Sequence, residues 1–308
     1  MLGGAGFLGS HLCERLLADG AEGVIAIDNL ATGNLLNLEG LRRDARFDLI
    51  AHDICLPLRV EGPIDYVFNL ASPASPKDFE VLWLEIMRVG SLGTQHALEL
   101  AESKQAVMLQ ASTSEIYGDP LVHPQVETYF GNVDSTGPRA VYDEAKRYGE
   151  AIVQAFRRKR GVSTRIVRIF NTYGPRMRLD DGRVVPQLVG QAMRGEDFTL
   201  YGDGSQTRSF CFVDDLIDGL VRLALSTEQD PVNIGNPREQ TIRELAEAVK
   251  ASMGSPGKLV FRPLPAGDPK QRKPDITRAK QILGWEPRVK IEEGLPLTIS
   301  YFKTLPSP

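Results

Sequence analysis

The stretch Gly3-Gly-Ala-Gly6-Phe-Leu-Gly9 decides the fold, because it joins a glycine-rich loop to the start of a helix. Leucines recur after the loop at helical spacing and predict one apolar helix face, formed by Leu8, Leu12, Leu16 and Leu17. Glycines let the backbone approach a pyrophosphate, which the free N–H groups and positive dipole of the helix N-terminus then hold. A plain glycine turn is the alternative interpretation.

A short apolar strand, Val24-Ile-Ala-Ile27, follows the helix and ends in Asp28, about twenty residues beyond the loop. A carboxylate at this position can accept hydrogen bonds from a ribose diol and repels a 2′-phosphate. The loop, helix and acidic strand end together predict a Rossmann-type α/β fold with a doubly wound parallel sheet. They also favour NAD over NADP as the cofactor.

The segment before the loop is short for this fold. A Rossmann loop follows a central strand of about five apolar residues, yet only Met1 and Leu2 precede Gly3. Burial of each apolar side chain contributes ~1.5–3 kcal/mol, so such a strand would contribute an amount comparable with the ~5–15 kcal/mol stability of a domain. We therefore expect the first strand to be missing, because the chain as given starts too late or is a damaged copy.

Strands alternate with helices beyond Asp28, which predicts a parallel sheet with crossover helices. The expected strands are 47–50, 66–70, 106–110 and 164–170, with helices ending near 103 and covering about 139–160. Polar residues collect where these strands end, at the edge where parallel sheets bind ligands. Each hydroxyl there has about even odds of only capping a turn.

After residue 172 the pattern loosens into short elements joined by Gly and Pro. We therefore predict an NAD-binding domain of residues 1–172 plus about 209–236, and a smaller C-terminal substrate-binding lobe of residues 173–208 and 237–308. Two polar segments, 200–208 and 268–275, carry arginines suited to phosphate or carboxylate. Taken singly, such arginines are more often solvated surface charges.

Composition excludes several functional classes. The 308 residues carry a net charge of −4 and no long run of like charge, which argues against a nucleic-acid binder. Three scattered cysteines and four histidines suggest neither a disulfide framework nor a metal site. No apolar run reaches the ~18 residues of a membrane span, and no signal peptide is evident. We therefore expect a cytoplasmic protein with no membrane partner.

The pattern Tyr142-Asp-Glu-Ala-Lys146 lies in the helix expected over about 139–160. Residues four apart share a helix face, so the phenol and the ammonium are expected to be neighbours. A phenol ionises near pH ~10, and nearby positive charges, including a nicotinamide ring, would favour its phenolate as a base. An isolated pattern of this kind is more often a surface helix pair.

Several longer segments resemble the extended branch of the short-chain dehydrogenase/reductases, which includes nucleotide-sugar epimerases, dehydratases and decarboxylases. Within that branch, these segments are most similar to the motifs of the UDP-glucuronate decarboxylase family. The segments are Leu70-Ala-Ser-Pro-Ala-Ser-Pro76, Ser112-Thr-Ser-Glu-Ile-Tyr-Gly-Asp-Pro120, Gly137-Pro-Arg139, Tyr142–Lys146, Arg168-Ile-Phe-Asn-Thr-Tyr-Gly-Pro-Arg-Met177, Asp181-Gly-Arg-Val-Val185 and Arg272-Lys-Pro-Asp-Ile276.

The resemblance implies a set of site residues. It implies Tyr142 as base, Lys146 as its support, Thr113 on the sugar 4-hydroxyl, and Glu115 and Arg272 beside the uronate. The cofactor residues that it implies, besides Tyr142 and Lys146, are Gly3, Gly6, Phe7, Leu8, Gly9, Asp28, Asn29, Asp53, Ile54, Leu70, Ala71 and Ser72. The substrate residues are Ser114, Asn171, Arg176, Val184, Tyr201, Arg208 and Arg272.

The resemblance also implies an activity: decarboxylation of UDP-glucuronate to UDP-xylose by a homodimer with bound NAD. Two alternatives stay open, a UDP-hexuronate 4-epimerase and a non-catalytic dinucleotide-binding protein. In the 4,6-dehydratases an aspartic acid takes the place of Ser114, and serine cannot protonate a leaving hydroxyl at neutral pH. The chain departs from the family at Asn69, usually histidine, and at Gly90, often asparagine.

Overall fold

The computed structural model describes residues 1–263 and 271–305, so the first residues of the polar segment 268–275 lie outside the described part. Two groups of parallel strands form the centre of the molecule. One group has four strands in the order β10-β5-β4-β3, and the other pairs β1 with β2. Their bounds are Val24–Asp28 (β1), Phe47–Ala51 (β2), Tyr66–Asn69 (β3), Val107–Thr113 (β4), Thr164–Ile169 (β5) and Val232–Ile234 (β10). The strands expected from the sequence are confirmed to within a few residues.

The first three residues join the two groups of strands. Leu2 forms parallel bridges to Ile27 of β1 and to Asn69 of β3. Its N–H donates to the Phe68 carbonyl at 2.9 Å, and its own carbonyl accepts from the Leu70 N–H at 3.0 Å. The Leu2 side chain is 1% exposed. A two-residue segment therefore occupies the position between β1 and β3, where the sequence predicted a missing strand.

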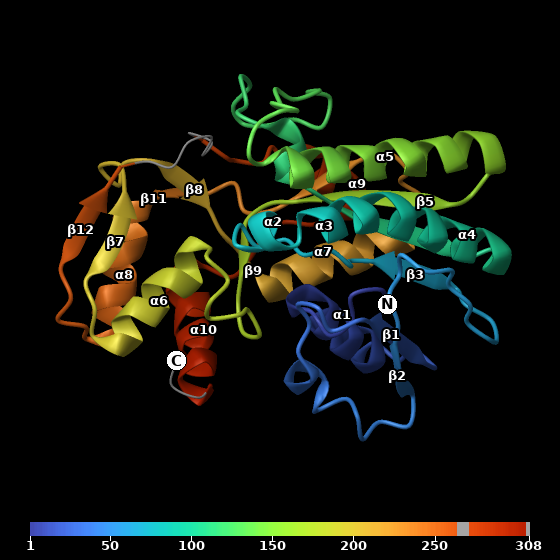
Figure 1. The fold of residues 1–308 in the computed structure, drawn as a ribbon, viewed down its shortest axis with the longest axis horizontal. Helices are drawn as coiled ribbons and strands as arrows, with labels where there is room; N and C mark the ends of the chain where they lie inside the picture. The colour runs from blue at the N-terminus through green and yellow to red at the C-terminus, as the bar shows by residue number, and fades with distance from the viewer. Residues whose placement is uncertain (264–270, 306–308) are drawn as a thin grey trace.

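Helices cover both faces of this sheet, because successive strand residues point to opposite sides. Met108 and Ile166 pack under α4 (Thr94–Lys104) and α5 (Ala140–Arg160). Their neighbours Leu109 and Val167 pack against α7 (Val213–Leu225), beside which α1 (Phe7–Ala18) lies. Figure 1 shows the two helical layers above and below the strands. Apolar residues on both sides of a strand are typical of parallel sheets.

The long helix expected to end near residue 103 is broken into four pieces. These are α2 (Asp78–Val81), α3 (Trp83–Arg88), the π-helical turn η2 (Val89–Gly93) and α4. At η2 the chain lies directly on α5: a Cβ added to Gly90 would lie 2.7 Å from the Ala145 Cβ. The family departure at Gly90 is therefore also a point of close contact with the helix that carries Tyr142.

A second group of elements lies at the left of Figure 1. It contains α6 (Val184–Arg194), α8 (Ile242–Met253) and α10 (Ile291–Thr304), the parallel pair β7 (Phe198–Tyr201) and β12 (Leu259–Arg262), and the antiparallel pair β8 (Thr207–Ser209) and β11 (Glu239–Thr241). Shorter elements complete the chain: η1 (Leu35–Leu38), η3 (Ser114–Tyr117), β6 (Thr172–Tyr173), β9 (Cys211–Phe212) and α9 (Thr277–Leu283).

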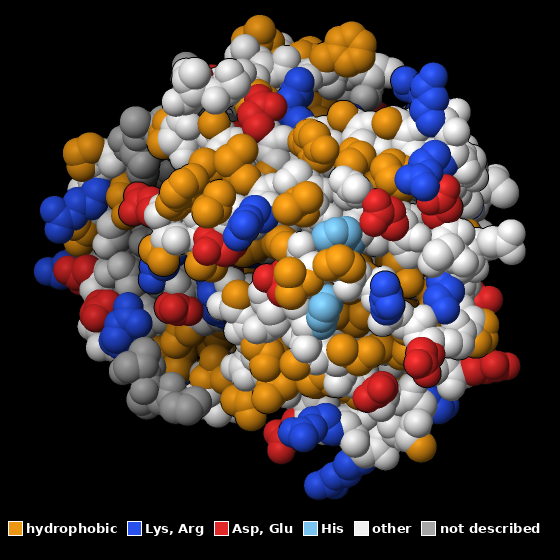
Figure 2. Space-filling view, turned by 45° about the vertical axis from the view of Figure 1, so that its right-hand side comes forward, with side chains coloured by type: hydrophobic (Ala, Val, Ile, Leu, Met, Phe, Trp, Pro, Cys, Tyr) orange, Lys and Arg blue, Asp and Glu red, His pale blue; other side chains and the backbone are white. Residues whose placement is uncertain are grey.

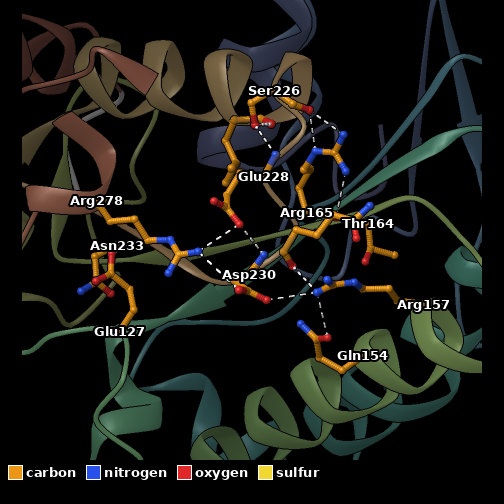
Figure 3. Close-up of polar contacts among 12 residues, drawn as sticks. Glu127, Gln154, Arg157, Thr164, Arg165, Ser226, Glu228, Asp230, Asn233 and Arg278 are labelled. Carbon is orange, nitrogen blue, oxygen red and sulfur yellow. Dashed lines mark hydrogen bonds and ion pairs between the residues drawn. The ribbon is translucent and has the colours of Figure 1, made fainter. Parts of the chain in front are cut away.

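Ion pairs fix the loop between α7 and β10 at the amino ends of β5 and β10 (Figure 3). Arg157 of α5 pairs with Asp230 at 3.1 Å, and Arg278 of α9 pairs with Glu228 at 3.0 Å. The buried Arg165 donates to the Ser226 carbonyl at 2.8 Å. This network lies at the opposite end of β5 from the polar residues that follow its carboxyl end.

The described residues contain no helix long and apolar enough to span a membrane. Within residues 1–263 and 271–305, no three His, Cys, Asp or Glu side chains are grouped to hold a metal ion. Cys13, Cys55 and Cys211 are all unpaired.

Candidate active site

A pocket opens at the carboxyl ends of β1, β2 and β3, where the glycine-rich loop turns into α1. Nine of the expected cofactor residues line it: Gly3, Gly6, Asp28, Asn29, Asp53, Ile54, Leu70, Ala71 and Ser72. Phe7, Leu8 and Gly9 form the first turn of α1 and are not part of this lining. Parallel sheets bind ligands at this edge.

The residues around this pocket fit a dinucleotide. Helix α1 begins at Gly6 without a side-chain cap, so its first N–H groups are available to a pyrophosphate. The buried Asp28 carboxylate accepts the Ala5 N–H at 2.9 Å and the Leu30 N–H at 2.8 Å. Each of its oxygens retains a lone pair for a ribose hydroxyl.

Gly9 tests the role of this loop. A Cβ at Gly9 would lie 2.0 Å from the Gly3 carbonyl oxygen, a backbone contact that no side-chain rotation relieves. We expect Gly9→Ala to lower the free energy of unfolding by about 1–3 kcal/mol, the usual cost of overpacking, and to weaken NAD binding. Thermal unfolding and calorimetric titration measure both effects. The control is Gly40→Ala, because a Cβ at Gly40 meets nothing within 4 Å; equal behaviour of the two variants would contradict the prediction.

Tyr142 lies in the first turn of α5, close to the carboxyl end of β4. The Thr113 hydroxyl is near enough to its phenol to lower the phenol pKa, and the Tyr142 ring stacks on Phe79 with centroids 4.9 Å apart. Lys146, one turn further along α5, places Nζ 5.7 Å from the Tyr142 ring centroid. The same ammonium donates to the Ala111 carbonyl at 3.1 Å. The structure therefore brings together the expected base, its supporting cation and the expected hydroxyl partner.

Burial dominates the ionisation of both groups. It raises the pKa of Tyr142 to about 12, although the positive charge of Arg183 and the nearby Thr113 hydroxyl act in the opposite direction. Burial also lowers the pKa of Lys146 to about 8. In the free protein the phenol is thus protonated at neutral pH, and it needs additional positive charge nearby to act as a base.

Glu115, the second residue of η3, lies between two arginines. Both of its carboxylate oxygens bind the Arg272 guanidinium, with Nη2 to Oε2 at 2.8 Å, and Arg139 Nη2 lies 2.5 Å from Oε2. Burial alone would raise the pKa of Glu115, but the charges of Arg272 and Arg139 outweigh it and lower the pKa. Glu115 is therefore an anion in a closed, positively charged setting.

Gln125 holds the chain segment that carries Arg272. This side chain is fully buried, and its Oε1 accepts the Lys273 N–H at 2.8 Å. The Gln125 backbone donates to the Lys273 carbonyl at 2.9 Å and accepts from Asp275 at 2.8 Å. Arg272 itself is 5% exposed. A loop that leaves the sheet after Glu115 thus returns to fix the arginine that Glu115 binds.

The expected substrate residues are only partly brought together. Ser114 is buried beside Thr113, and Asn171 follows β5 at the same edge of the sheet. Val184 begins α6, while Tyr201 and the buried Arg208 lie on β7 and β8. Arg176 instead turns toward α1, where its Nη2 pairs with Glu14 at 2.6 Å. Its Nη1 is buried and has no hydrogen-bond partner among the described residues, and its expected role in holding the UDP stays a prediction.

Three charged residues of the site were not assigned a role from the sequence. Arg139 and Asp143 flank Tyr142 in the first turn of α5, at helical spacing that would have indicated their position. Arg183 acts on Tyr142 from the turn before α6, and its Nη2 donates to the Ala74 carbonyl at 2.6 Å. Arg183 belongs to the Asp181-Gly-Arg motif, but no local sequence pattern indicated that its side chain would act on Tyr142.

Comparison with known proteins agrees with this geometry. Residues 1–235 match the model of the NAD dependent epimerase/dehydratase family. The chain is 48% identical over 301 residues to UDP-glucuronic acid decarboxylase 1 of Xenopus tropicalis, covering 98% of this chain and 71% of that protein. It is also 48% identical to UDP-glucuronic acid decarboxylase 5 of Arabidopsis thaliana, covering 98% and 88%.

A similar solved structure is UDP-glucuronic acid 4-epimerase from Bacillus cereus in complex with UDP-glucuronic acid and NAD. It has a TM-score of 0.87 and 27% identity, and the match covers 98% of each chain. UDP-glucose 4-epimerase from Thermotoga maritima with UDP-glucose has a TM-score of 0.88 and 30% identity, covering 98% of this chain and 97% of that one. The chain therefore belongs to the NAD dependent epimerase/dehydratase family.

Proposed function

We propose that this protein is a UDP-glucuronate decarboxylase that converts UDP-glucuronate to UDP-xylose and carbon dioxide with tightly held NAD. The observation that carries the proposal is the meeting of Glu115 and Arg272 beside the Thr113–Tyr142 pair. A base for a sugar hydroxyl and a cation for a sugar carboxylate are then available to the same substrate. Similarity to the decarboxylases over 98% of the chain supports this substrate.

The first step is oxidation at C4 of the sugar. Tyr142 takes the proton of the 4-hydroxyl, while Thr113 orients that hydroxyl and Lys146 contributes positive charge. Bound NAD would supply the acceptor for the C4 hydride and would give the hydride back at the end, so it would not be consumed. Gly3, Gly6 and Asp28 would hold the dinucleotide, with its pyrophosphate at the N-terminus of α1.

The second step is loss of carbon dioxide. Once C4 is a ketone, the C6 carboxylate belongs to a β-keto acid, and the electrons of the breaking C5–C6 bond enter an enolate. Arg272 pairs with the carboxylate and then stays close to the enolate charge. A solvent proton is then added at C5, with the Glu115 carboxylate orienting its delivery, and return of the hydride to C4 would complete UDP-xylose. The residues proposed to hold the UDP are Asn171, Arg176, Val184, Tyr201 and Arg208.

Mass spectrometry of the product formed from UDP-glucuronate tests the function. The expected product has lost the mass of carbon dioxide and is a UDP-pentose. An unchanged mass with inverted C4 would identify a UDP-hexuronate 4-epimerase, the activity named for the Bacillus cereus relative. Recovery of unchanged substrate from NAD-loaded protein would favour a non-catalytic dinucleotide-binding protein.

We further propose a homodimer built on the face formed by α2, α3, η2 and α5. Hydrophobic side chains gather over the upper half of the face in Figure 2. Exposed residues on these elements include Val81, Trp83, Leu84, Met87, Leu92 and Tyr148. A patch of this kind on adjacent helices is suited to burial against a second copy. Sedimentation should give twice the chain mass, and Leu84→Glu should reduce it while Leu121→Glu, on an exposed loop elsewhere, should not.

The predicted division into residues 1–172 plus about 209–236 and residues 173–208 plus 237–308 stays part of this proposal. The unpaired state of all three cysteines supports the expected cytoplasmic location.

A further inference from the structure

Arg139 and Arg272 reach Glu115 from different parts of the chain. Arg139 is the N-cap of α5, and its carbonyl accepts the N–H groups of Tyr142 at 3.0 Å and Asp143 at 3.1 Å. Arg272 belongs to a segment that Gln125 holds, 157 positions beyond Glu115. Arg139 is therefore fixed to the start of the helix that carries Tyr142, whereas Arg272 comes from a separate segment of the chain.

The Arg139 guanidinium is fixed by two neighbours. Its Nη2 bonds Glu115 Oε2 at 2.5 Å, and its Cζ lies 5.5 Å from the centroid of the Phe79 ring. Phe79 stacks in turn on Tyr142. Cation–π contact and a charge-assisted hydrogen bond together hold a guanidinium more firmly than either alone. The orientation of Arg139 is therefore coupled to both Glu115 and Tyr142.

In the proposed reaction, Glu115 needs a second cation besides Arg272. A uronate carboxylate that binds Arg272 competes with Glu115 for the same guanidinium. A buried carboxylate that loses its only cation becomes strongly unfavourable or takes up a proton. Arg139 already bonds Oε2, so it is the cation that would remain with Glu115 if Arg272 turned to the substrate.

Other acidic groups face Glu115 and increase its need for a second cation. Asp143 and Tyr142 face it from α5, and both cations of the cluster act on Asp143. Burial, followed by the negative charge of Glu115, raises the pKa of Asp143 to about 7, and its Oδ1 has no hydrogen-bond partner among the described residues. Arg183 faces Tyr142 from the turn before α6. The carboxylate of a bound uronate would therefore add a third acidic group beside Glu115 and Asp143.

We propose that Arg139 is a positioning residue that holds Glu115 oriented and ionised while Arg272 binds the substrate carboxylate. This role rests on the proposed function. It also explains why a guanidinium lies three residues before the catalytic tyrosine.

The pH dependence of carbon dioxide release from UDP-glucuronate tests the role. Arg139→Gln removes the charge, so the pKa of Glu115 should rise and Glu115 should be protonated at higher pH. We expect the acid limb of kcat to move up by roughly 1–3 pH units, the range for losing one close opposite charge. Arg139→Lys should restore most of the limb. Arg160→Gln is the control, because Arg160 lies at the far end of α5 and pairs with Glu102.

Two results would overturn the role: an equal loss of kcat at every pH, or a KM that rises for all UDP-sugars while kcat holds. In a Glu115→Gln background, Arg139→Gln should add no further shift, whereas a purely structural role would add its full loss. Should Arg139→Gln fail to fold, Arg139→Met replaces it, because Met keeps an aliphatic stem beside Phe79 without the charge. An acid limb that stays in place in Arg139→Met would overturn the role.

A readout without turnover separates this role from the proposed function. Infrared difference titration of the Glu115 carboxyl, assigned with Glu115→Gln, reports its proton affinity in the free protein. A higher pKa in Arg139→Gln than in the parent supports the electrostatic role even if UDP-glucuronate is not the substrate. An unchanged pKa rejects it even if the parent protein releases carbon dioxide.

Discussion

Tyr142→Phe should retain the fold and bind NAD while turnover of UDP-glucuronate falls by roughly 10²–10⁴, the usual contribution of a positioned acid–base group. The substitution removes the hydroxyl that lies near Thr113 and leaves the ring stacked on Phe79. Because packing is preserved, the loss should appear in kcat with little change in melting temperature. Steady-state carbon dioxide release and thermal unfolding measure the two quantities.

Tyr66→Phe is the control, since Tyr66 begins β3, is 38% exposed and lies outside both the active site and the proposed dimer face. This variant should behave as the parent. Turnover of Tyr142→Phe within about threefold of the parent would remove Tyr142 as the base, because an acid–base group of this kind contributes far more.

Arg272→Ala should separate oxidation from decarboxylation. Tyr142 and Thr113 are untouched by this change, so the 4-keto sugar should still form. Carbon dioxide release should slow by on the order of 10²-fold or more, about the cost of one preorganised charge contact in a closed site. Quenching single turnovers with borodeuteride labels the 4-keto uronate at C4, and trapped carbon dioxide measures the second step.

Lys273→Ala is the control for this segment, because the neighbouring side chain pairs with Glu239 and does not bind Glu115. If Arg272 only binds the nucleotide, KM should rise for every UDP-sugar and kcat should hold. No accumulation of labelled uronate together with an unchanged kcat would leave Arg272 a binding residue.

Local periodicity accounts for the parts of the site that the sequence predicted well. Tyr142 and Lys146 share a helix face through spacing alone, and Asp28 ends a strand at a fixed distance from the glycine-rich loop. The break between residues 78 and 104 was not predictable in this way. One part of it, the π-helical turn η2, contains Gly90, which packs closely on Ala145, and no local preference reveals that contact.

Long-range contacts limited the remaining predictions. The Glu115–Arg272 pair joins residues 157 positions apart, and only family resemblance indicated it. Arg176 was expected to hold the UDP, and its pairing with Glu14, 162 positions earlier in the chain, could not be read from the sequence. Arg139 lay in a recognised motif, but its role depends on where Phe79 and Glu115 meet it in space.

The short segment between β1 and β3 couples cofactor binding to the rate at which the sheet opens locally. Amide hydrogens of Gly3, Ile27 and Leu70 are held by carbonyls across this junction, and all three residues also line the cofactor pocket. Exchange with solvent deuterium requires these bonds to break, and a narrow junction opens more readily than the centre of a wide sheet. Dinucleotide bound against the loop would therefore slow exchange at Ile27 as well as at the loop. Peptide-level deuterium uptake would then report occupancy from a strand residue buried in the sheet.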